Sequence, residues 1–223
     1  PLFQAEDGIR DNIPSLVGSE MCIRDSSWGT ALALETYLAH PEGVKAIVFN
    51  SPYFSTAIWE ADADTLITYL PDSIQKAIET GEREGVFTSK GYQQANRVFM
   101  KNYGVRIERP SNPWDTVKAK RNDFIYNYMW GPTEFTATGS LKSYDRFENL
   151  KDIKVPVLFL TGEFDEARPS TVRRFHNQVR GSEFIVIEGA GHGTMHDNRE
   201  QNIEAIRSFL NRIDDQEPNL TED

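Results

Sequence analysis

The stretch Ser26-Ser-Trp-Gly-Thr-Ala-Leu-Ala-Leu-Glu35 decides the fold that we predict for this chain. Apolar residues recur through it and beyond it at helical spacing, at Ala31, Leu34 and Leu38. The pair His40-Pro41 ends the predicted helix, because proline cannot continue a helix and restricts the residue before it. Ser27 therefore stands immediately before a predicted helix.

Ser27 has two interpretations. In the first, it sits on a strained strand-to-helix turn, where a nucleophilic serine needs small neighbours in the pattern G-x-S-x-G. Gly29 supplies the second glycine, whereas Asp25 stands in place of the first. The helix N-terminus would then place the N–H of Trp28 beside a developing oxyanion. In the second, Ser27 only caps the helix, which is a common use of serine.

The rest of the chain alternates between short apolar runs and helical patterns. Buried strands are predicted at residues 44–49, 155–160 and 184–187. Helices are predicted at residues 72–80, 89–103, 170–180 and from Asn198 to about residue 213, where Gln201 is placed for a capping box. A helix followed by such a strand is one repeat of a parallel α/β sheet. The predicted fold class is therefore α/β.

Between the first and second of these strands the pattern changes to short helical segments. Aromatic residues are dense there: Trp59, Tyr69, Phe87, Tyr92, Phe99, Trp114, Phe124, Tyr126, Tyr128 and Trp130. Aromatic side chains of this kind usually form the core of a small subdomain, and some could contact a ligand. We predict a helical cap over residues 54–149, inserted into a core made of residues 27–53 and 150–223.

The first 26 residues show neither helical nor strand periodicity. Residues 4–11 spell the translation of a common short-read sequencing adapter, and residues 16–25 resemble the translated transposase-end adapter that follows it. Scars of this type are excluded from fold reasoning. We therefore expect residues 1–26 to be non-native, and the native strands before the nucleophile to be missing.

The composition of the chain limits which kinds of molecule it could bind. The chain has 223 residues and a formal net charge of -10, which argues against a surface for nucleic acid or anionic membrane. It contains no run of roughly 18 apolar residues, so no transmembrane helix is expected. Cys22 is the only cysteine, which rules out an internal disulfide. We expect a cytoplasmic protein, and the sequence leaves its oligomeric state open.

Two further residues stand where the partners of a nucleophilic serine are expected. In α/β folds with this chemistry the chain order is serine, acid, histidine. Asp165 follows the predicted strand at residues 155–160, and His192 follows the one at residues 184–187 between two glycines. Both lie at carboxyl ends of parallel strands, where such sheets gather their sites. His192 would take the proton of Ser27, and Asp165 would orient and stabilise the imidazole.

The other histidines have simpler interpretations. His40 lies at a helix C-terminus, where positive charge is favourable, and His176 lies inside a predicted helix. His196 and His192 have the i,i+4 spacing of a zinc site, but Gly193-Thr194 disfavours a helix there and no glutamate follows His192. We therefore expect neither a metal nor a cofactor.

Four segments together resemble the proline iminopeptidases, α/β-hydrolases that release N-terminal residues, preferentially proline, from peptides. They are residues 27–35, 128–139, 162–166 and 188–192. The resemblance extends from Ser27 to about Ile213. The elbow and histidine patterns occur in many α/β-hydrolases, whereas Gly131-Pro-Thr-Glu-Phe135 and the pair Asp165-Glu166 are more particular to aminopeptidases. The resemblance implies a partial α/β-hydrolase fold with an inserted helical cap.

The resemblance also implies how the substrate is recognised. Glu134 from the cap and Glu166 beside the acid would bind the free α-ammonium group of a short peptide or amino-acid amide. Two carboxylates over the site would provide charge-assisted hydrogen bonds to a terminal cation. From position alone, Glu134 could equally be a solvent-exposed cap residue and Glu166 a charge at a helix entry.

Three functions remain open at this stage. The first is a serine aminopeptidase that works through an acyl-enzyme. The second is an esterase or amidase of other specificity, and the third is a non-catalytic hydrolase fold that binds a partner. The first glycine of the elbow and a second oxyanion donor are absent, so we expect the chain as written to be inactive and prone to aggregate.

Overall fold

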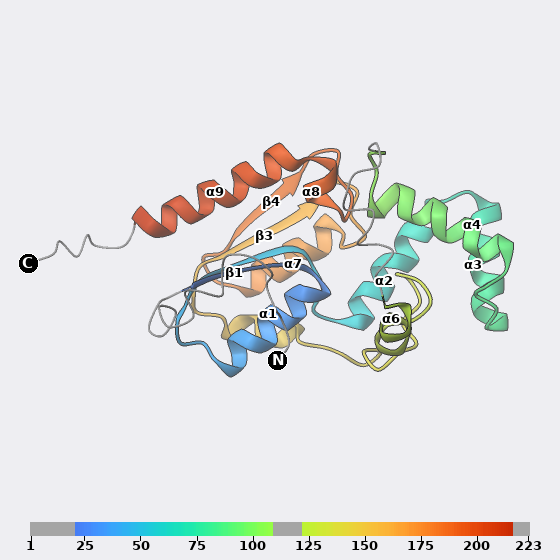
Figure 1. The fold of residues 1–223 in the computed structure, drawn as a ribbon, viewed down its shortest axis with the longest axis horizontal. Helices are drawn as coiled ribbons and strands as arrows, with labels where there is room; N and C mark the ends of the chain where they lie inside the picture. The colour runs from blue at the N-terminus through green and yellow to red at the C-terminus, as the bar shows by residue number, and fades with distance from the viewer. Residues whose placement is uncertain (1–20, 109–121, 216–223) are drawn as a thin grey trace, which may run out of the picture.

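A computed structural model describes residues 21–108 and 122–215 of the chain. Trp114 and residues 1–20 of the segment predicted to be foreign therefore lie outside the described residues. Among the described residues, four strands form a parallel sheet in the order β1(Met21–Ser27), β2(Val44–Pro52), β3(Val157–Gly162) and β4(Glu183–Ile187) (Figure 1). The three strands predicted from apolar runs are confirmed, with ends that differ by a few residues.

The strands are in register so that their carboxyl ends lie at one edge of the sheet. Ser27 pairs with Pro52 between β1 and β2, and Gly162 pairs with Ile187 between β3 and β4. The loops that follow the strands therefore emerge at the same edge, where open α/β sheets bind their ligands.

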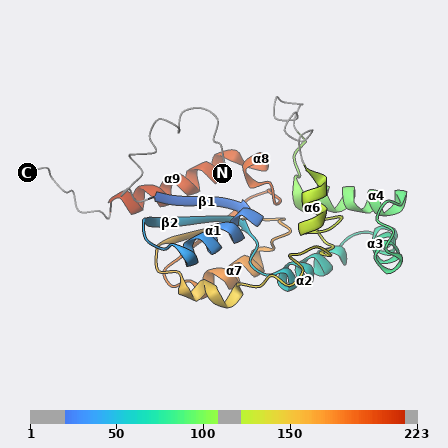
Figure 2. The ribbon, with the colours of Figure 1, turned by 60° about the horizontal axis from the view of Figure 1, so that its bottom comes forward.

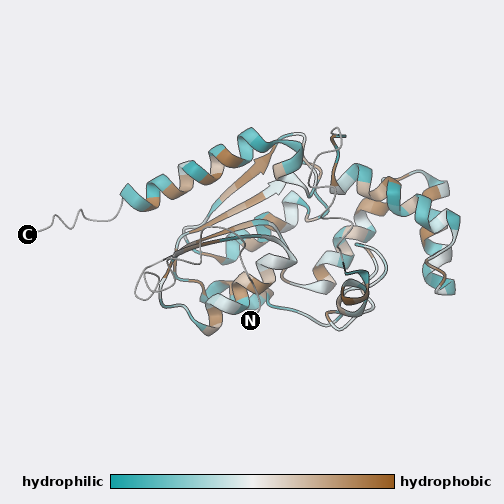
Figure 3. Cartoon of the chain, in the orientation of Figure 1, coloured by the Kyte–Doolittle hydropathy of each residue, from teal (hydrophilic) through white to brown (hydrophobic). Residues whose placement is uncertain are grey.

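Helices cover both faces of the sheet. Alternate residues of β2 and β3 point to opposite faces, because side chains alternate along a strand. On one face, Phe49 and Phe159 pack with α1(Trp28–Ala39) and α7(Pro169–Gln178). On the other, Val48 and Leu158 pack with α9(Arg199–Asp215). Figure 2 shows α9 on one side of the sheet and α1 with α7 on the other. Figure 3 shows apolar strands between helices of mixed polarity.

A second group of helices connects β2 to β3. They are α2(Thr56–Ile67), α3(Asp72–Glu84), α4(Lys90–Phe99), the π-helical turn η2(Met100–Gly104), α6(Asp123–Met129) and the 3-10 helix η3(Phe147–Asp152). Of these, α2, α3, α4 and α6 lie beyond the edge of the sheet where the strands end (Figure 1). Tyr92, Phe99 and Phe135 belong to a separate apolar core there. The boundaries predicted for a cap at residues 54–149 stay a prediction.

Two predicted helix ends were wrong. The helix predicted at residues 72–80 runs to Glu84 and ends at Gly85, whose φ of 65° is the left-handed conformation that glycine adopts freely. Gly81 is instead buried within α3, where a side chain would overlap the ring of Tyr92. The helix predicted at residues 89–103 changes at Met100 into the π-helical turn η2.

The native strands before the nucleophile were expected to be missing, but β2 does have a neighbour on that side. Residues 21–27, six of which belong to the segment predicted to be foreign, form β1 and pair with β2. Side chains alternate between exposed Cys22 and Arg24 and partly buried Ile23 and Asp25, which is the period of a strand. β1 is one of the two edge strands of the described sheet. None of the helices at residues 21–108 and 122–215 has the length and apolarity to span a bilayer.

Candidate active site

Ser27 lies at the turn between β1 and α1, in a strained backbone conformation. Its φ is 54° and its ψ is -132°, a region that residues with a side chain rarely occupy. Such strain costs on the order of 1–3 kcal/mol and clusters at functional sites. The Ser27 hydroxyl makes no capping hydrogen bond to α1, so the interpretation of this serine as a helix cap was wrong.

The elbow accommodates Asp25 only because residue 29 is glycine. A Cβ on Gly29 would overlap the carboxylate of Asp25. That carboxylate accepts a hydrogen bond from the N–H of Ser26, with an N–O distance of 2.8 Å. Residues 25 and 29 face each other across the turn, so a side chain fits at only one of them. This explains why the pattern G-x-S-x-G has glycine at both positions.

Asp165 is fixed by the loop that follows β3. Its Oδ2 accepts hydrogen bonds from the N–H of Gly162 and the hydroxyl of Thr161, both at 3.1 Å. Its Oδ1 accepts from the N–H of Ala167 at 2.8 Å. The carboxylate is buried, so its orientation is set before any ligand arrives. The remaining partner of Oδ1 is Nδ1 of His192, at 2.8 Å.

His192 follows β4 and lies in a largely buried position beside two carboxylates. Nδ1 is 2.8 Å from Asp165 Oδ1 and 3.7 Å from Glu166 Oε1. Burial by itself would lower the pKa of His192, but the charges of Asp165 and Glu166 outweigh it and raise the pKa to about 9. The imidazole also meets the ring of Trp59 edge to face, with centroids 5.5 Å apart.

Glu166 is a buried carboxylate without a hydrogen-bond donor. Only 2% of its surface is exposed, and neither Oε1 nor Oε2 has a hydrogen-bond partner among the described residues. Burial raises its pKa well above the ordinary value; His192 opposes this shift, while the charges of Glu134 and Asp165 add to it. A buried carboxylate in this state is costly unless a cation binds to it.

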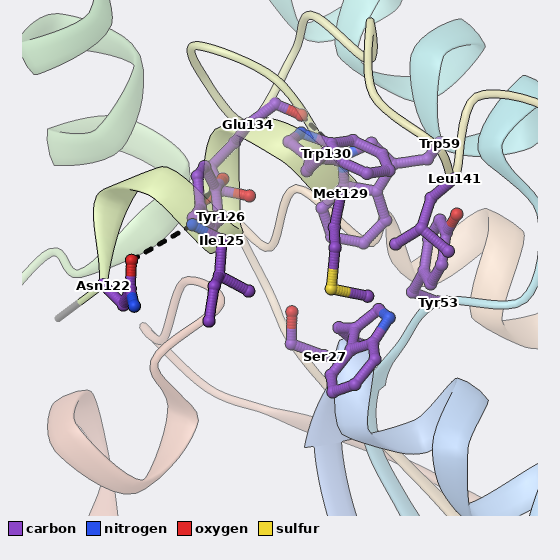
Figure 4. Close-up of a pocket in the computed structure, with 11 residues that line it drawn as sticks. Ser27, Tyr53, Trp59, Asn122, Ile125, Tyr126, Met129, Trp130, Glu134 and Leu141 are labelled. Carbon is purple, nitrogen blue, oxygen red and sulfur yellow. Dashed lines mark hydrogen bonds between the residues drawn. The ribbon is translucent and has the colours of Figure 1, made fainter.

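A cavity of about 320 Å³ opens above Ser27. Its walls are mainly apolar and aromatic, and it is lined by Ser27, Trp28, Tyr53, Trp59, Asn122, Ile125, Tyr126, Met129, Trp130, Glu134 and Leu141. In Figure 4, Met129 points toward Ser27 from the opposite wall. Glu134 is the only carboxylate of this lining, and Tyr126 donates its hydroxyl to Glu134 Oε1 at 2.6 Å.

The predicted site residues fall into two adjoining groups. Asp165, Glu166 and His192 contact one another, whereas Ser27, Trp28 and Glu134 line the cavity. The ring of Trp59 belongs to both, because it lines the cavity and touches the imidazole. Within the described part of the chain, no hydrogen bond joins the Ser27 hydroxyl to His192. In unliganded enzymes such bonds are often long and tighten when substrate binds.

Some residues of the site were missed by the sequence interpretation. Trp59 and Tyr126 were noted only as aromatics of the cap, and nothing in their spacing separates site aromatics from core aromatics. Ser51 donates its hydroxyl to the carbonyl of His192 at 3.1 Å and has a φ of 50°. Residues 194–197 form the short helix α8(Thr194–Asp197), although glycine and threonine were expected to disfavour a helix there.

The fold and this site define the class of protein. A family model described as the alpha/beta hydrolase fold matches residues 26–199. The proline iminopeptidase of Heyndrickxia coagulans is 38% identical over 196 residues, which cover 87% of this chain and 68% of the relative. That of Lactobacillus helveticus is 29% identical over 199 residues, which cover 88% of this chain and 67% of the relative. The chain belongs to the α/β-hydrolase family and, within it, to the proline iminopeptidases.

Solved structures agree with this assignment. The crystal structure of the proline iminopeptidase from Mycobacterium smegmatis matches with a TM-score of 0.79 and 26% sequence identity. The match covers 90% of this chain and 68% of that structure. A structure titled VinJ matches with a TM-score of 0.81 and 25% identity over 92% of this chain. The chain thus spans about two thirds of the length of the relatives that it matches.

Proposed function

We propose that this chain carries the catalytic residues of a serine aminopeptidase that releases N-terminal proline, or a similar residue, from short peptides. The observation that carries the proposal is the buried Glu166 carboxylate. It lacks a hydrogen-bond donor among the described residues and lies 3.7 Å from His192 Nδ1. A free α-ammonium group would supply the missing hydrogen-bond donors, with a positive charge on them.

In the proposed reaction, the oxygen of Ser27 attacks the carbonyl carbon of the N-terminal residue. Its proton passes to Nε2 of His192, and Asp165 stabilises the imidazolium through Nδ1. The N–H of Trp28 donates to the oxyanion of the tetrahedral intermediate. The intermediate collapses as His192 returns the proton to the leaving amine, which leaves an acyl-enzyme on Ser27. Water, deprotonated by His192, then hydrolyses this ester and frees the amino acid.

Two carboxylates would select a free N-terminus. Glu166 is buried beside His192, and Glu134 faces the cavity where its carboxylate is held by Tyr126. An ammonium group between them would neutralise both. An internal peptide bond offers no cation and would leave both carboxylates desolvated and unpaired, so it would bind poorly.

The apolar cavity suits a nonpolar N-terminal residue. Trp59, Trp130 and Met129 offer flat and polarisable surfaces to an apolar ring. The substrate is therefore proposed to be a small peptide or amino-acid amide, and neither nucleic acid nor a membrane surface fits this acidic chain.

We further propose that the chain with this sequence hydrolyses its substrate slowly. Trp28 is the one oxyanion donor that we identify among the described residues, and a site with one donor fewer is slower by about a hundred- to thousand-fold. The carboxylate of Asp25 also occupies the space beside Gly29 in the turn that presents Ser27, where the pattern G-x-S-x-G has a glycine. β1 is also an edge strand, which favours aggregation.

Substitution of the two carboxylates tests the proposal. Glu134→Gln and Glu166→Gln are compared with the unmodified chain and with a surface control, Glu148→Gln. An aminopeptidase loses kcat/KM for a proline anilide by about 10- to 1,000-fold in the two site variants, since a charge-assisted bond is worth about 1.5–3 kcal/mol or more when buried. Hydrolysis of a neutral ester changes little.

If both substrates lose activity in parallel, the carboxylates do not select an amine and the chain is an esterase or amidase of other specificity. If neither substrate reacts and a fluorophosphonate does not label Ser27, the fold serves binding alone. Either result rejects the aminopeptidase.

A further inference from the structure

One segment of the chain contacts both of the loops that carry the proposed acid and base. The segment at residues 103–107 begins within the π-helical turn η2 and continues past its end, and it packs against both loops. The guanidinium of Arg106 lies over the ring of Phe164 at 3.7 Å from its centroid, and Arg106 Nε donates to the carbonyl of Gly189 at 3.1 Å. The segment therefore touches the loop of Asp165 and the loop of His192 at once.

The backbone of His192 is held directly by this segment. The N–H of His192 donates to the carbonyl of Tyr103 at 2.8 Å, and the N–H of Gly193 donates to the carbonyl of Gly104 at 2.9 Å. The approach is close, because a Cβ on Gly191 would lie 2.6 Å from the Gly104 carbonyl oxygen. The position of the imidazole thus depends on where residues 103–107 lie.

Asp197 ties the same two pieces of chain together. Its carboxylate accepts hydrogen bonds from the N–H of Arg106 and Ile107 at 3.0–3.1 Å, and from the N–H of Gly191 at 2.9 Å. Gly191 immediately precedes His192. Burial alone would raise the pKa of Asp197, but these N–H donors outweigh it and lower the pKa, so the carboxylate is ionised at neutral pH.

We propose that Asp197 is a positioning residue for His192. Its carboxylate fastens residues 103–107 to the loop of His192 and so holds the imidazole against Asp165. The inference rests on the proposed function of His192 as the general base. In this inference, residues 103–107 help to hold the imidazole of His192 in place.

A merely structural role for Asp197 predicts a different outcome. Asp62 offers the matched comparison, since it is also a buried carboxylate and is bonded to Thr171 at 2.9 Å and to Arg168 at 3.4 Å. It does not contact the loop of His192. Loss of either carboxylate removes buried hydrogen bonds and destabilises the fold, but only loss of Asp197 should displace the imidazole.

The experiment compares Asp197→Asn with Asp62→Asn in the full chain. An amide at residue 197 places an NH2 group against backbone N–H donors that need an acceptor, so at least one of the three bonds is lost. Three quantities are measured: the titration of the His192 imidazole by NMR, the rate of labelling of Ser27 by a fluorophosphonate, and the midpoint of urea unfolding.

We expect Asp197→Asn to lower the pKa of His192 and to slow labelling by about 10- to 100-fold, the cost of a misplacement near 1 Å. Asp62→Asn should leave both quantities near those of the unmodified chain, even if it unfolds at lower urea. An unchanged titration of His192 in Asp197→Asn, or an equal change in both variants, overturns the inference.

Failure of the proposed function gives a distinct result. If Ser27 is not labelled even in the unmodified chain, the serine hydrolase proposal fails. The NMR titration still decides whether Asp197 holds His192 against Asp165, because it requires no turnover.

Discussion

Nδ1 of His192 lies 2.8 Å from Oδ1 of Asp165, and this contact joins the loops that follow two neighbouring strands of the sheet. The loop of His192 contains Gly189, Gly191 and Gly193. Gly162, at the end of β3, has no room for a side chain beside Ala190 and Gly191. The acid and the base are therefore brought together by backbone packing of the two loops as well as by their own charges.

The first prediction concerns pH. Because the pKa of His192 is about 9 and a general base must be neutral, kcat/KM for a proline anilide should rise with pH through about 9. Asp165→Asn removes the largest of the influences that raise the pKa, so the rising limb should move to lower pH. The same change should reduce kcat by about 10³- to 10⁴-fold, since the tautomer is no longer held. Steady-state assays across pH measure both effects.

The same pKa predicts how stability depends on pH. The pKa of His192 is raised in the folded state above its ordinary value of 6.5. The charged imidazole therefore stabilises the fold fully below pH 6.5, and this contribution is lost as the pH rises through about 9. Between pH 6.5 and about 9, the free energy of unfolding measured in urea should fall less in His192→Gln than in the unmodified chain. Equal losses in the two proteins would contradict the pKa.

Two substitutions of Ser27 should differ in their effect on stability but not in their effect on labelling. Ser27→Gly should stabilise the chain by about 1–3 kcal/mol, because glycine adopts φ 54° and ψ -132° without strain. Ser27→Ala keeps the strained backbone and should leave the free energy of unfolding within about 0.5 kcal/mol. Both variants should lose fluorophosphonate labelling. Greater stability in Ser27→Ala than in Ser27→Gly would show that backbone strain is not located at this residue.

Asp25 and Gly29 should be energetically coupled. Gly29→Ala places a methyl group where the Asp25 carboxylate lies, so it should destabilise the unmodified chain. In an Asp25→Gly background the same substitution should cost less, with a coupling energy of about 0.5–3 kcal/mol. Asp25→Gly alone should also speed labelling of Ser27, because it restores the first glycine of the pattern G-x-S-x-G. Additive effects in the double-mutant cycle would refute the contact.

Glu166 should lower the stability of the fold while it is required for cleavage of the substrate. Glu166→Met replaces a buried carboxylate that lacks a hydrogen-bond donor by an apolar side chain of similar length, and we expect a gain in the free energy of unfolding of on the order of 1 kcal/mol. Cleavage of a proline anilide should be lost in the same variant. Urea unfolding and the anilide assay check the two effects, and a loss of stability would mean that Glu166 has a donor that holds it in the free protein.

Much of the sheet could be predicted from sequence, because β2 and β3 are buried on both faces and leave continuous apolar runs. The ends of helices were harder to predict. Gly81 looked like a stop signal, but its missing side chain lets α3 approach Tyr92. β1 was not predicted, because only its pairing with β2 distinguishes it from an irregular segment.

The site was predictable where chain order and loop position carry information. Asp165 and His192 each follow a strand, and Ser27 precedes a helix. Glu134 and Glu166 came from a family resemblance, since their burial and proximity cannot be deduced from spacing. Ser51 and Asp197 left no signal, because their partners lie up to 141 residues away in the sequence and meet only in the folded chain.

Site mapping of a fluorophosphonate adduct tests the central assignment most directly. The full chain is incubated with the reagent, digested and examined by mass spectrometry, beside a His192→Gln variant. We expect one phosphonylated serine, at position 27, and we expect this adduct to form far more slowly when the imidazole is gone. An adduct at another serine, or equal labelling in the two proteins, would contradict it.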